Sequence, residues 1–473
     1  MNWGLWARYF YGFWIACHTP LFGYLVTGNE VAMTEQGKFG RAVTVPRHRA
    51  WRAARLGSMA VNVAGNMAAQ RVQGALRGER VAIRELLMTP SNIGRITNEL
   101  ARMRGAAMKL GQLVSMDAGD VLPPELSQIM ARLRAEADFM PPAQLKKVLT
   151  TAWGNDWLRQ FEKFDVRPIA AASIGQVHRA KLKDGREVAI KVQYPGVAQS
   201  IDSDVANVAT LAKLSGLIPN GFEIDSYVEE ARKQLHEETD YLLEAAHLRR
   251  FRNLLEGSDR YELPEVLDDL TSSSILTMSF VQSQPLETVT DLDQDIRNRI
   301  AEELVDLVLR ELFEFGVVQS DPNFANFRYN TVTERVVLLD FGATRTIDAS
   351  LAQKYRDMIL AGLDDDTEAL HTAAGRLGIW DATTAPRHIE QLMRMLKMVF
   401  ATIRDDEFYD FADPALTQQM NAEGMALAES GFVPPPLPID VLFIQRKLGG
   451  IFLIAANLKA KLPLEQIIRA RLC

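Results

Sequence analysis

The stretch from Asp321 to Gly342 reads DPNFANFRYNTVTERVVLLDFG, and it indicates the fold class more clearly than any other part of the chain. The apolar run VVLL ends at an acidic residue, Asp340, and a short apolar run of this kind is typical of a buried strand. The interval from Asp321 to Asn326 equals that of the D-x-x-x-x-N catalytic loop of protein kinases, and D-F-G follows in the kinase order. The stretch therefore predicts the catalytic loop and the metal-binding strand end of a kinase-like fold.

A second kinase pattern lies upstream, where residues 188–191 read VAIK at the end of an alternating strand. The alternation predicts that Lys191 faces a cleft while Val188 and Ile190 pack on the other side of the strand. In kinases the lysine of V-A-I-K holds the α- and β-phosphates of the nucleotide. Asn326 and Asp340 are then predicted to bind Mg²⁺ through hard oxygen ligands, and Asp321 lies where the proton of a nucleophile would go.

A buried lysine needs a carboxylate partner to offset its loss of hydration. Residues 223–252 predict one long helix, and it offers four candidates, Glu237, Glu238, Asp240 and Glu244. At roughly 100° per residue, Asp240 and Glu244 share a face, whereas Glu238 and Glu244 point about 120° apart. One helix can therefore serve two separate cations. The alternative is that these carboxylates form an acidic face exposed to solvent. The spacing alone does not decide between this and pairing with cations.

The remaining periodicity places strands early and helices late. Residues 161–192 alternate around the turn KDG and predict a hairpin, 273–281 and 335–339 predict strands, and 293–315 and most of the remainder predict helices. This pattern predicts an α+β, bilobal protein-kinase-like fold with a small sheet-bearing N-lobe and a larger helical C-lobe. The expected divisions are an apolar segment at 1–32, a helical extension at 33–158, the N-lobe at 159–283 and the C-lobe at 284–473.

Composition sets limits on partners and compartment. The chain has 473 residues, enough for two lobes, and a net charge of -7, which gives no global electrostatic reason to bind nucleic acid. Its two cysteines, Cys17 and Cys473, lie near opposite ends of the chain. This usage indicates a reducing compartment and excludes a disulfide or zinc framework.

The N-terminus is the exception to this plain composition. Residues 5–26 are rich in aromatic and aliphatic side chains but contain Arg8 and His18. The segment is about long enough to span a bilayer, and a surface-lying anchor or a translation start at Met33 are equally compatible readings. A basic cluster follows, which is either a solvated helix start or a site for anionic lipid headgroups: Arg41, Arg47, His48, Arg49, Arg52 and Arg55.

Two parts of the kinase pattern are altered. Where kinases have the glycine-rich loop G-x-G-x-x-G, residues 170–177 read AAASIGQV. Alanine restricts the backbone to negative φ and adds methyl groups where glycine would let amides approach the phosphates. Asp321 is preceded by QS instead of His-Arg, and no A-P-E follows Asp340. The half of a protein kinase that docks a protein substrate is therefore missing or rebuilt.

Several motifs together resemble the UbiB/ADCK family, the AarF-domain group of atypical kinase-like proteins that supports coenzyme Q biosynthesis. They are KLGQ at 109–112, AEADFMP at 135–141, AAASIGQVH at 170–178, QSDPNFANF at 319–327 and LLDFGATR at 338–345. The resemblance runs from about residue 98 to residue 345 and continues more weakly through QRKLGG at 445–450. The form DPNFAN is similar to the coenzyme Q branch of the family.

The resemblance implies roles for residues outside the kinase motifs. Lys109 and Gln112 match a K-x-G-Q motif on an N-terminal helical extension that folds over the active site and gates it. Glu238 and Asp240 match an E-x-D motif that engages Lys109. Glu244 is then the partner of the phosphate-binding lysine.

The resemblance also implies a nucleotide site and a setting. The loop formed by Ala170, Ala171, Ala172 and Ser173 covers ATP or ADP, and the main chain from Met278 to Val281 contacts adenine. The expected activity is that of an ATPase supporting ubiquinone biosynthesis, with a phosphotransferase for a small or lipid-like acceptor and a nucleotide-switched scaffold as alternatives. The expected setting is cytoplasmic and peripheral to the inner membrane, with an anionic membrane surface, quinone-biosynthesis proteins or lipid-like precursors as partners. Whether the chain forms a homodimer stays open.

Overall fold

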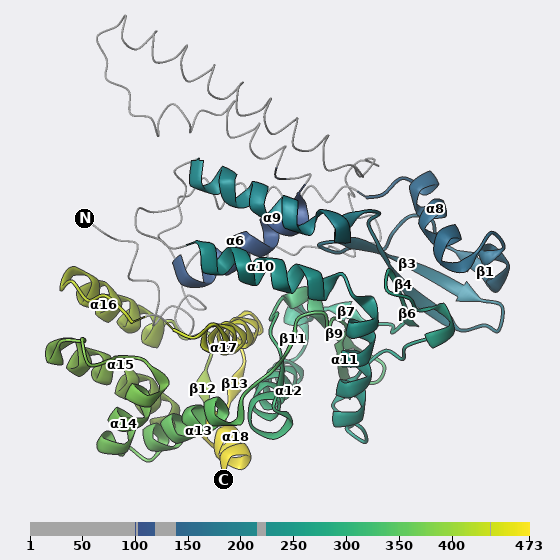
Figure 1. Cartoon of the computed structure of the whole chain (residues 1–473). Helices are drawn as coiled ribbons and strands as arrows, with labels where there is room; N and C mark the ends of the chain where they lie inside the picture. The colour runs from purple at the N-terminus through teal and green to yellow at the C-terminus, as the bar shows by residue number, and fades with distance from the viewer. Residues whose placement is uncertain (1–99, 101–102, 119–138, 215–223, 436) are drawn as a thin grey trace, which may run out of the picture.

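The computed structural model describes residues 100, 103–118, 139–214, 224–435 and 437–473. The apolar N-terminal segment, the basic cluster and most of the motif at 135–141 lie outside the described residues. The rest forms a small sheet-bearing lobe and a larger helical lobe, which confirms the α+β bilobal class (Figure 1). Within the described ranges, no helix combines the length and the apolar character needed to cross a bilayer.

The small lobe is built on a five-stranded antiparallel sheet with the order β1-β3-β4-β6, in which β2 pairs with β3. The predicted turn joins β3 to β4 and carries Gly185 at a φ of 91°, a left-handed conformation that favours glycine. The predicted hairpin is present as β3 and β4, and residues 161–192 hold two further strands that were not predicted, β1 and β2. The strands are β1 (Phe161–Phe164), β2 (Ala170–Ala171), β3 (Gly175–Leu182), β4 (Glu187–Gln193) and β6 (Ile275–Ser279).

Helix α8 (Pro142–Trp153) covers the outer face of this sheet. It starts with a proline, which is suited to the first turn, and it is followed by Gly154 at a φ of 84°. Its buried residues Leu145 and Leu149 pack with Trp157 of the 3₁₀ turn η3 (Trp157–Gln160) and with the apolar side chains of β4. This separate core fixes the face of β4 that points away from the cleft.

Four helices accompany the sheet of the small lobe: α6 (Arg104–Ala118), α9 (Val197–Leu214), α10 (Asp225–Glu238) and α11 (Tyr241–Leu254). α6 lies beside α9 and α10 (Figure 1). The single helix predicted over residues 223–252 was wrong, because α10 ends at Glu238. Asp240 has an extended backbone, and its carboxylate accepts hydrogen bonds from the amides of Leu242 and Leu243, which starts α11. The angular argument across one continuous helix therefore does not apply.

The chain passes to the large lobe through residues 280–283, so the expected boundary at 283/284 falls at the start of β7. A four-stranded sheet has the order β5-β10-β9-β7, and β8 pairs with β11. The helix predicted over 293–315 is α12, which continues into a π-helical turn that ends at Gly316. The bounds are β5 (Tyr261–Glu262), η4 (Asp268–Leu270), β7 (Gln284–Pro285), η5 (Leu286–Asp291), α12 (Gln294–Arg310), β8 (Val317–Gln319), β9 (Phe327–Asn330), β10 (Arg335–Leu338) and β11 (Thr344–Thr346).

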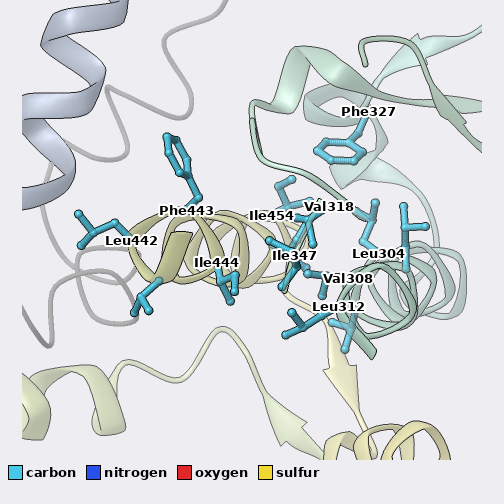
Figure 2. Packing of buried hydrophobic residues seen from close by; sticks show 14 of the residues in the cluster. Leu304, Val308, Leu312, Val318, Phe327, Ile347, Leu442, Phe443, Ile444 and Ile454 are labelled. Atoms are coloured by element: carbon cyan, nitrogen blue, oxygen red, sulfur yellow. The ribbon is translucent and has the colours of Figure 1, made fainter. Parts of the chain in front are cut away.

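α17 is a mostly apolar helix that forms part of the core and packs against α12. Figure 2 shows Ile454, Ile347, Val318 and Val308 gathered between α17 and α12. α17 thus lies beside both strands that flank the catalytic motifs. The bounds are α13 (Ala349–Leu363), α14 (Thr367–Leu377), α15 (Pro386–Asp405), β12 (Tyr409–Asp410), α16 (Ala415–Glu429), α17 (Ile439–Asn457), β13 (Lys461–Leu462) and α18 (Leu464–Leu472).

Candidate active site

Lys191 and Glu244 form a buried ion pair at the centre of the site. The Lys191 ammonium donates to both oxygens of Glu244, at 2.8 Å and 2.9 Å. Lys191 lies on the face of β4 opposite to Val188 and Ile190, which pack into the outer core as predicted. Glu244 lies in the first turn of α11. Of the four carboxylates that the sequence left open, the structure pairs Lys191 with Glu244.

Asp340 brings a second carboxylate to the same lysine, with its Oδ2 atom 3.4 Å from the Lys191 ammonium. Burial raises the pKa of Glu244 to about 7, although the ammonium opposes this change. Desolvation also acts to raise the pKa of Asp340, but Lys191 and the amide of Gly342 outweigh it, so this pKa lies below its ordinary value. Burial opposes the charge on Lys191, yet both carboxylates hold the lysine pKa well above its ordinary value. The lysine therefore stays charged within an acidic cluster.

One face of α11 fixes both the lysine and the D-F-G segment. His247 Nδ1 donates to the carbonyl oxygen of Phe341 at 3.2 Å, and the rings of Phe251 and Phe341 have centroids 4.8 Å apart. Glu244, His247 and Phe251 are three and four residues apart in turn, so they share one side of the helix. A change in the position of α11 would therefore move Lys191, Asp340 and Phe341 together.

The catalytic-loop motif is closed on itself by the Asn326 side chain. Its Nδ2 atom donates to the carbonyl oxygen of Asp321 at 2.9 Å and to Asp321 Oδ2 at 3.1 Å. The loop contains the 3₁₀ turn η7 (Phe324–Asn326), which begins where the side chain of Asn323 accepts from the Ala325 amide. Asp321 Oδ1 accepts a hydrogen bond from Arg446 of α17 at 2.9 Å. Each carboxylate oxygen of Asp321 therefore has a donor.

The alanine-rich loop is a tight antiparallel turn. Ala170 and Ala171 pair with β3, the Ala172 amide donates to the carbonyl oxygen of Gly175, and the loop residues keep negative φ angles, as predicted for alanine. Ser173 donates to Glu238 Oε2 at 2.9 Å. Most of the turn is thus held by contacts within the protein.

The residues expected to gate the site separate into two groups. Lys109, which is buried on α6, forms an ion pair with Glu238. Asp240 was expected to engage Lys109 as well. Its Oδ1 atom caps α11 by accepting from two backbone amides, and the contact with Lys109 stays a prediction. The side chain of Gln112 lies outside the described residues. A Cβ atom at Gly105 of α6 would lie 3.1 Å from Ile174, so α6 packs closely on the alanine-rich turn.

The residues expected to contact adenine lie at the exit of the small lobe. Met278 is buried on β6 and pairs with Ala189 of β4, and Val281 is half-buried two residues after β6 ends. Both therefore lie where the chain leaves the small lobe for the large one. Their expected main-chain contacts with a nucleotide stay a prediction.

No role was predicted for α17, yet three of its residues contact the catalytic loop or the end of β8 just before it. Besides Arg446, Lys447 donates to Gln319 at 3.2 Å, and a Cβ atom at Gly450 would lie 2.3 Å from Pro322 Cβ. A signal was present, because residues 441–454 read VLFIQRKLGGIFLI and place two cations inside an apolar helix. Buried cations need partners, and such partners lie far away in the sequence.

Comparisons with known proteins agree with this geometry. Residues 132–374 match the family described as the ABC1 atypical kinase-like domain. The chain is 37% identical over 425 residues to the mitochondrial atypical kinase COQ8B of Danio rerio, covering 88% of this chain and 67% of that protein. It is 34% identical over 433 residues to the mitochondrial atypical kinase COQ8 of Saccharomyces cerevisiae, covering 91% of this chain and 86% of that protein.

A solved structure shows the same fold. The complex of Rv3197 with erythromycin from Mycobacterium tuberculosis has a TM-score of 0.57 at 21% identity, covering 89% of this chain and 97% of that one. The match of more than half the chain, together with relatives at this level of identity, confirms the resemblance stated from the motifs. The chain therefore belongs to the ABC1 atypical kinase-like family.

Proposed function

We propose that the chain binds Mg-ATP in the cleft between its lobes and cleaves the γ-phosphate as an atypical kinase-fold ATPase. The observation that carries this proposal is the convergence of Lys191, Glu244 and Asp340. These residues come from β4, α11 and the segment after β10, and Lys191 and Asp340 approach to 3.4 Å although 149 positions separate them. A lysine held by a helix carboxylate beside a D-F-G aspartate is the arrangement by which kinases hold nucleotide phosphates.

The residues on the catalytic side fit a magnesium ion. Asn326 uses its amide nitrogen to contact Asp321, so its carbonyl oxygen is the atom that would bind the metal. The low pKa of Asp340 keeps this group a carboxylate at neutral pH. Such hard oxygen ligands suit Mg²⁺, which would neutralise the β- and γ-phosphates. Lys191 would donate to the α- and β-phosphates, and Asp321 would orient the attacking water or the acceptor hydroxyl.

Water is the acceptor that the surroundings of the site favour over a protein. The turn at 170–173 is tied to Glu238 through Ser173, and Glu238 is tied to Lys109 of α6. A helix packed against the phosphate-covering turn restricts the approach of a peptide. A phosphotransferase for a small or lipid-like molecule is the second candidate, and the D-x-x-x-x-N pair of Asp321 and Asn326 favours it.

An ATPase assay with purified protein tests the first candidate. Asp340→Asn and Lys191→Ala are each expected to lower turnover by on the order of 100-fold, because each removes charge stabilisation in the transition state. Asp364→Asn is the matched control, since Asp364 is half-exposed and pairs with Arg469 instead. Undiminished turnover in both site variants would remove the assignment. A phosphorylated quinone precursor or lipid found by mass spectrometry would favour the second candidate.

We further propose that the activity supports coenzyme Q biosynthesis at the cytoplasmic face of a membrane, with quinone-biosynthesis proteins or lipid-like precursors as partners. Membership of the same family as the COQ8 proteins supports this role. In a deletion strain, the wild-type gene should restore quinone content and the Asp340→Asn gene should not. Full restoration by Asp321→Asn would instead favour a nucleotide-switched scaffold. Cosedimentation of the full chain with anionic and neutral vesicles tests the membrane contact.

A further inference from the structure

We propose that Arg446 is a positioning residue for Asp321, and that one face of α17 supports the catalytic loop in place of the His-Arg pair that precedes this aspartate in protein kinases. The role of Asp321 in catalysis rests on the function proposed above. The contact between α17 and the loop does not depend on it.

Arg446 holds the carboxylate from the side opposite to Asn326. Its Nη2 atom lies 2.9 Å from Asp321 Oδ1, while Asn326 donates to Oδ2 at 3.1 Å. The Arg446 side chain is 13% exposed, so water screens this charge-assisted bond only partly. Donors on both oxygens fix the rotation of the carboxylate, which one donor alone would leave variable.

Lys447 holds the residue two positions before Asp321. Lys447 is 1% exposed, and its ammonium lies 3.2 Å from Gln319 Oε1 and 3.1 Å from Glu311 Oε2. A buried ammonium is stable only where such partners are present. Gln319 occupies the position of the histidine in the kinase H-R-D sequence. A cation from α17 therefore fixes the end of β8, just before the loop begins.

Gly450 completes this face by close contact with the residue after Asp321. A Cβ atom at Gly450 would lie 2.3 Å from Pro322 Cβ and 2.4 Å from Pro322 Cγ. Arg446 and Lys447 are four and three residues before Gly450, so all three lie on one side of the helix. This one face thus contacts positions on both sides of Asp321 as well as Asp321 itself.

Steady-state ATPase kinetics of full-length Arg446→Gln and Arg446→Lys test the proposal. Arg446→Gln is expected to lower kcat by roughly 10- to 100-fold, because a small displacement of a catalytic group has effects of this size. The KM for ATP should stay within about twofold, since Lys191, the residue proposed to bind the phosphates, is held by Glu244 and Asp340. Arg446→Lys, which keeps the charge, should recover part of kcat. Arg469→Gln, which removes a surface arginine paired with Glu465, is the matched control and should leave kcat unchanged.

A double-mutant cycle with Asp321→Asn separates positioning from general support of the fold. If Arg446 acts through the Asp321 carboxylate, Arg446→Gln should change the residual kcat by less than about twofold in the Asp321→Asn background. An equal loss of kcat in both backgrounds, or an unchanged kcat in Arg446→Gln, would overturn the proposal.

Hydrogen exchange provides a readout that needs no turnover. The amides of Ala325 and Asn326 are bonded inside the loop, to the side chain and carbonyl of Asn323. Arg446→Gln should speed their exchange several-fold in the wild-type background and not in the Asp321→Asn background. This result would uphold the positioning role even if the wild-type chain hydrolysed no ATP, and equal exchange in all variants would overturn it.

Discussion

The most direct test of the contact between α17 and the catalytic loop is the substitution Gly450→Ala. The added Cβ atom would lie 2.3 Å from Pro322 Cβ, whereas carbon atoms in contact are normally about 3.5 to 4.0 Å apart. The helix and the loop must therefore separate by more than about 1 Å. Pro322 has a rigid ring next to the backbone of Asp321, so a side-chain rotation cannot relieve the overlap.

Two opposing effects set the change in the free energy of unfolding that Gly450→Ala causes. Overpacking of a core contact costs about 1 to 3 kcal/mol, while replacing glycine by alanine inside a helix gains about 0.5 to 1 kcal/mol. The free energy of unfolding should therefore fall by roughly 1 to 2 kcal/mol. Displacement of the loop by about 1 Å should lower kcat by on the order of 100-fold, which is far more than the stability change alone would produce.

Chemical denaturation and ATPase kinetics are measured on Gly450→Ala and on two matched controls. A Cβ atom at Gly362 of α13 would lie 2.2 Å from the Phe400 ring of α15, so Gly362→Ala should cost similar stability without a loss of kcat. Among the described residues, no heavy atom outside the neighbouring turns of α16 lies within 4 Å of a Cβ atom at Gly424 of this helix, so Gly424→Ala should raise stability slightly. A kcat in Gly450→Ala equal to that of Gly362→Ala would refute the idea that α17 holds the loop.

Three further predictions concern the small lobe. Burial raises the pKa of Glu244 from 4.5 to about 7, so the folded state binds this proton more tightly than the unfolded state. The proton therefore contributes roughly 3 kcal/mol to the free energy of unfolding below about pH 4.5, and this contribution is lost as the pH rises to about 7. In urea denaturation, Glu244→Gln should flatten the pH dependence of stability between these values. Lys109→Met removes the ion pair with Glu238 and should speed the release of fluorescent ADP in stopped flow, whereas an unchanged rate would argue against gating by α6. Gly175→Ala would place a Cβ atom 2.5 Å from the carbonyl oxygen of Val192 and should lower the midpoint of denaturation, at a cost of about 1 to 3 kcal/mol.

The central site was predictable because each of its motifs is encoded locally. The alternation around Lys191 indicates which way its side chain points, and the apolar run before Asp340 indicates a strand that ends at the cleft. Because the two motifs follow the same order along the chain as in kinases, a kinase-like fold is expected to bring them together. The partner of Lys191 was less certain, because four carboxylates follow one another within eight residues and only the three-dimensional arrangement selects Glu244.

The break between α10 and α11 could have been read from the sequence but was not. Asp240 is followed by YLLE, and an aspartate before an apolar run is a common start of a helix. The continuous acidic pattern of residues 237–244 concealed this signal. The capping role of Asp240, whose Oδ1 atom accepts from the first amides of α11, was therefore missed, while its expected gating role stays a prediction.

The support of the catalytic loop by α17 could not be derived from spacing, for a physical reason. In protein kinases the residues next to the aspartate in sequence take part in the motif, so the motif can be recognised locally. Here Arg446 lies 125 positions after Asp321, and Lys447 lies 128 positions after Gln319. A residue pair so far apart in the chain is visible in the sequence only as a charged residue within a helix that is otherwise apolar. Two adjacent cations within the apolar run of α17 are such a trace. The helix tolerates them because each has a carboxylate partner, which is Asp321 of the catalytic loop for Arg446 and Glu311 of the π-helical turn before β8 for Lys447.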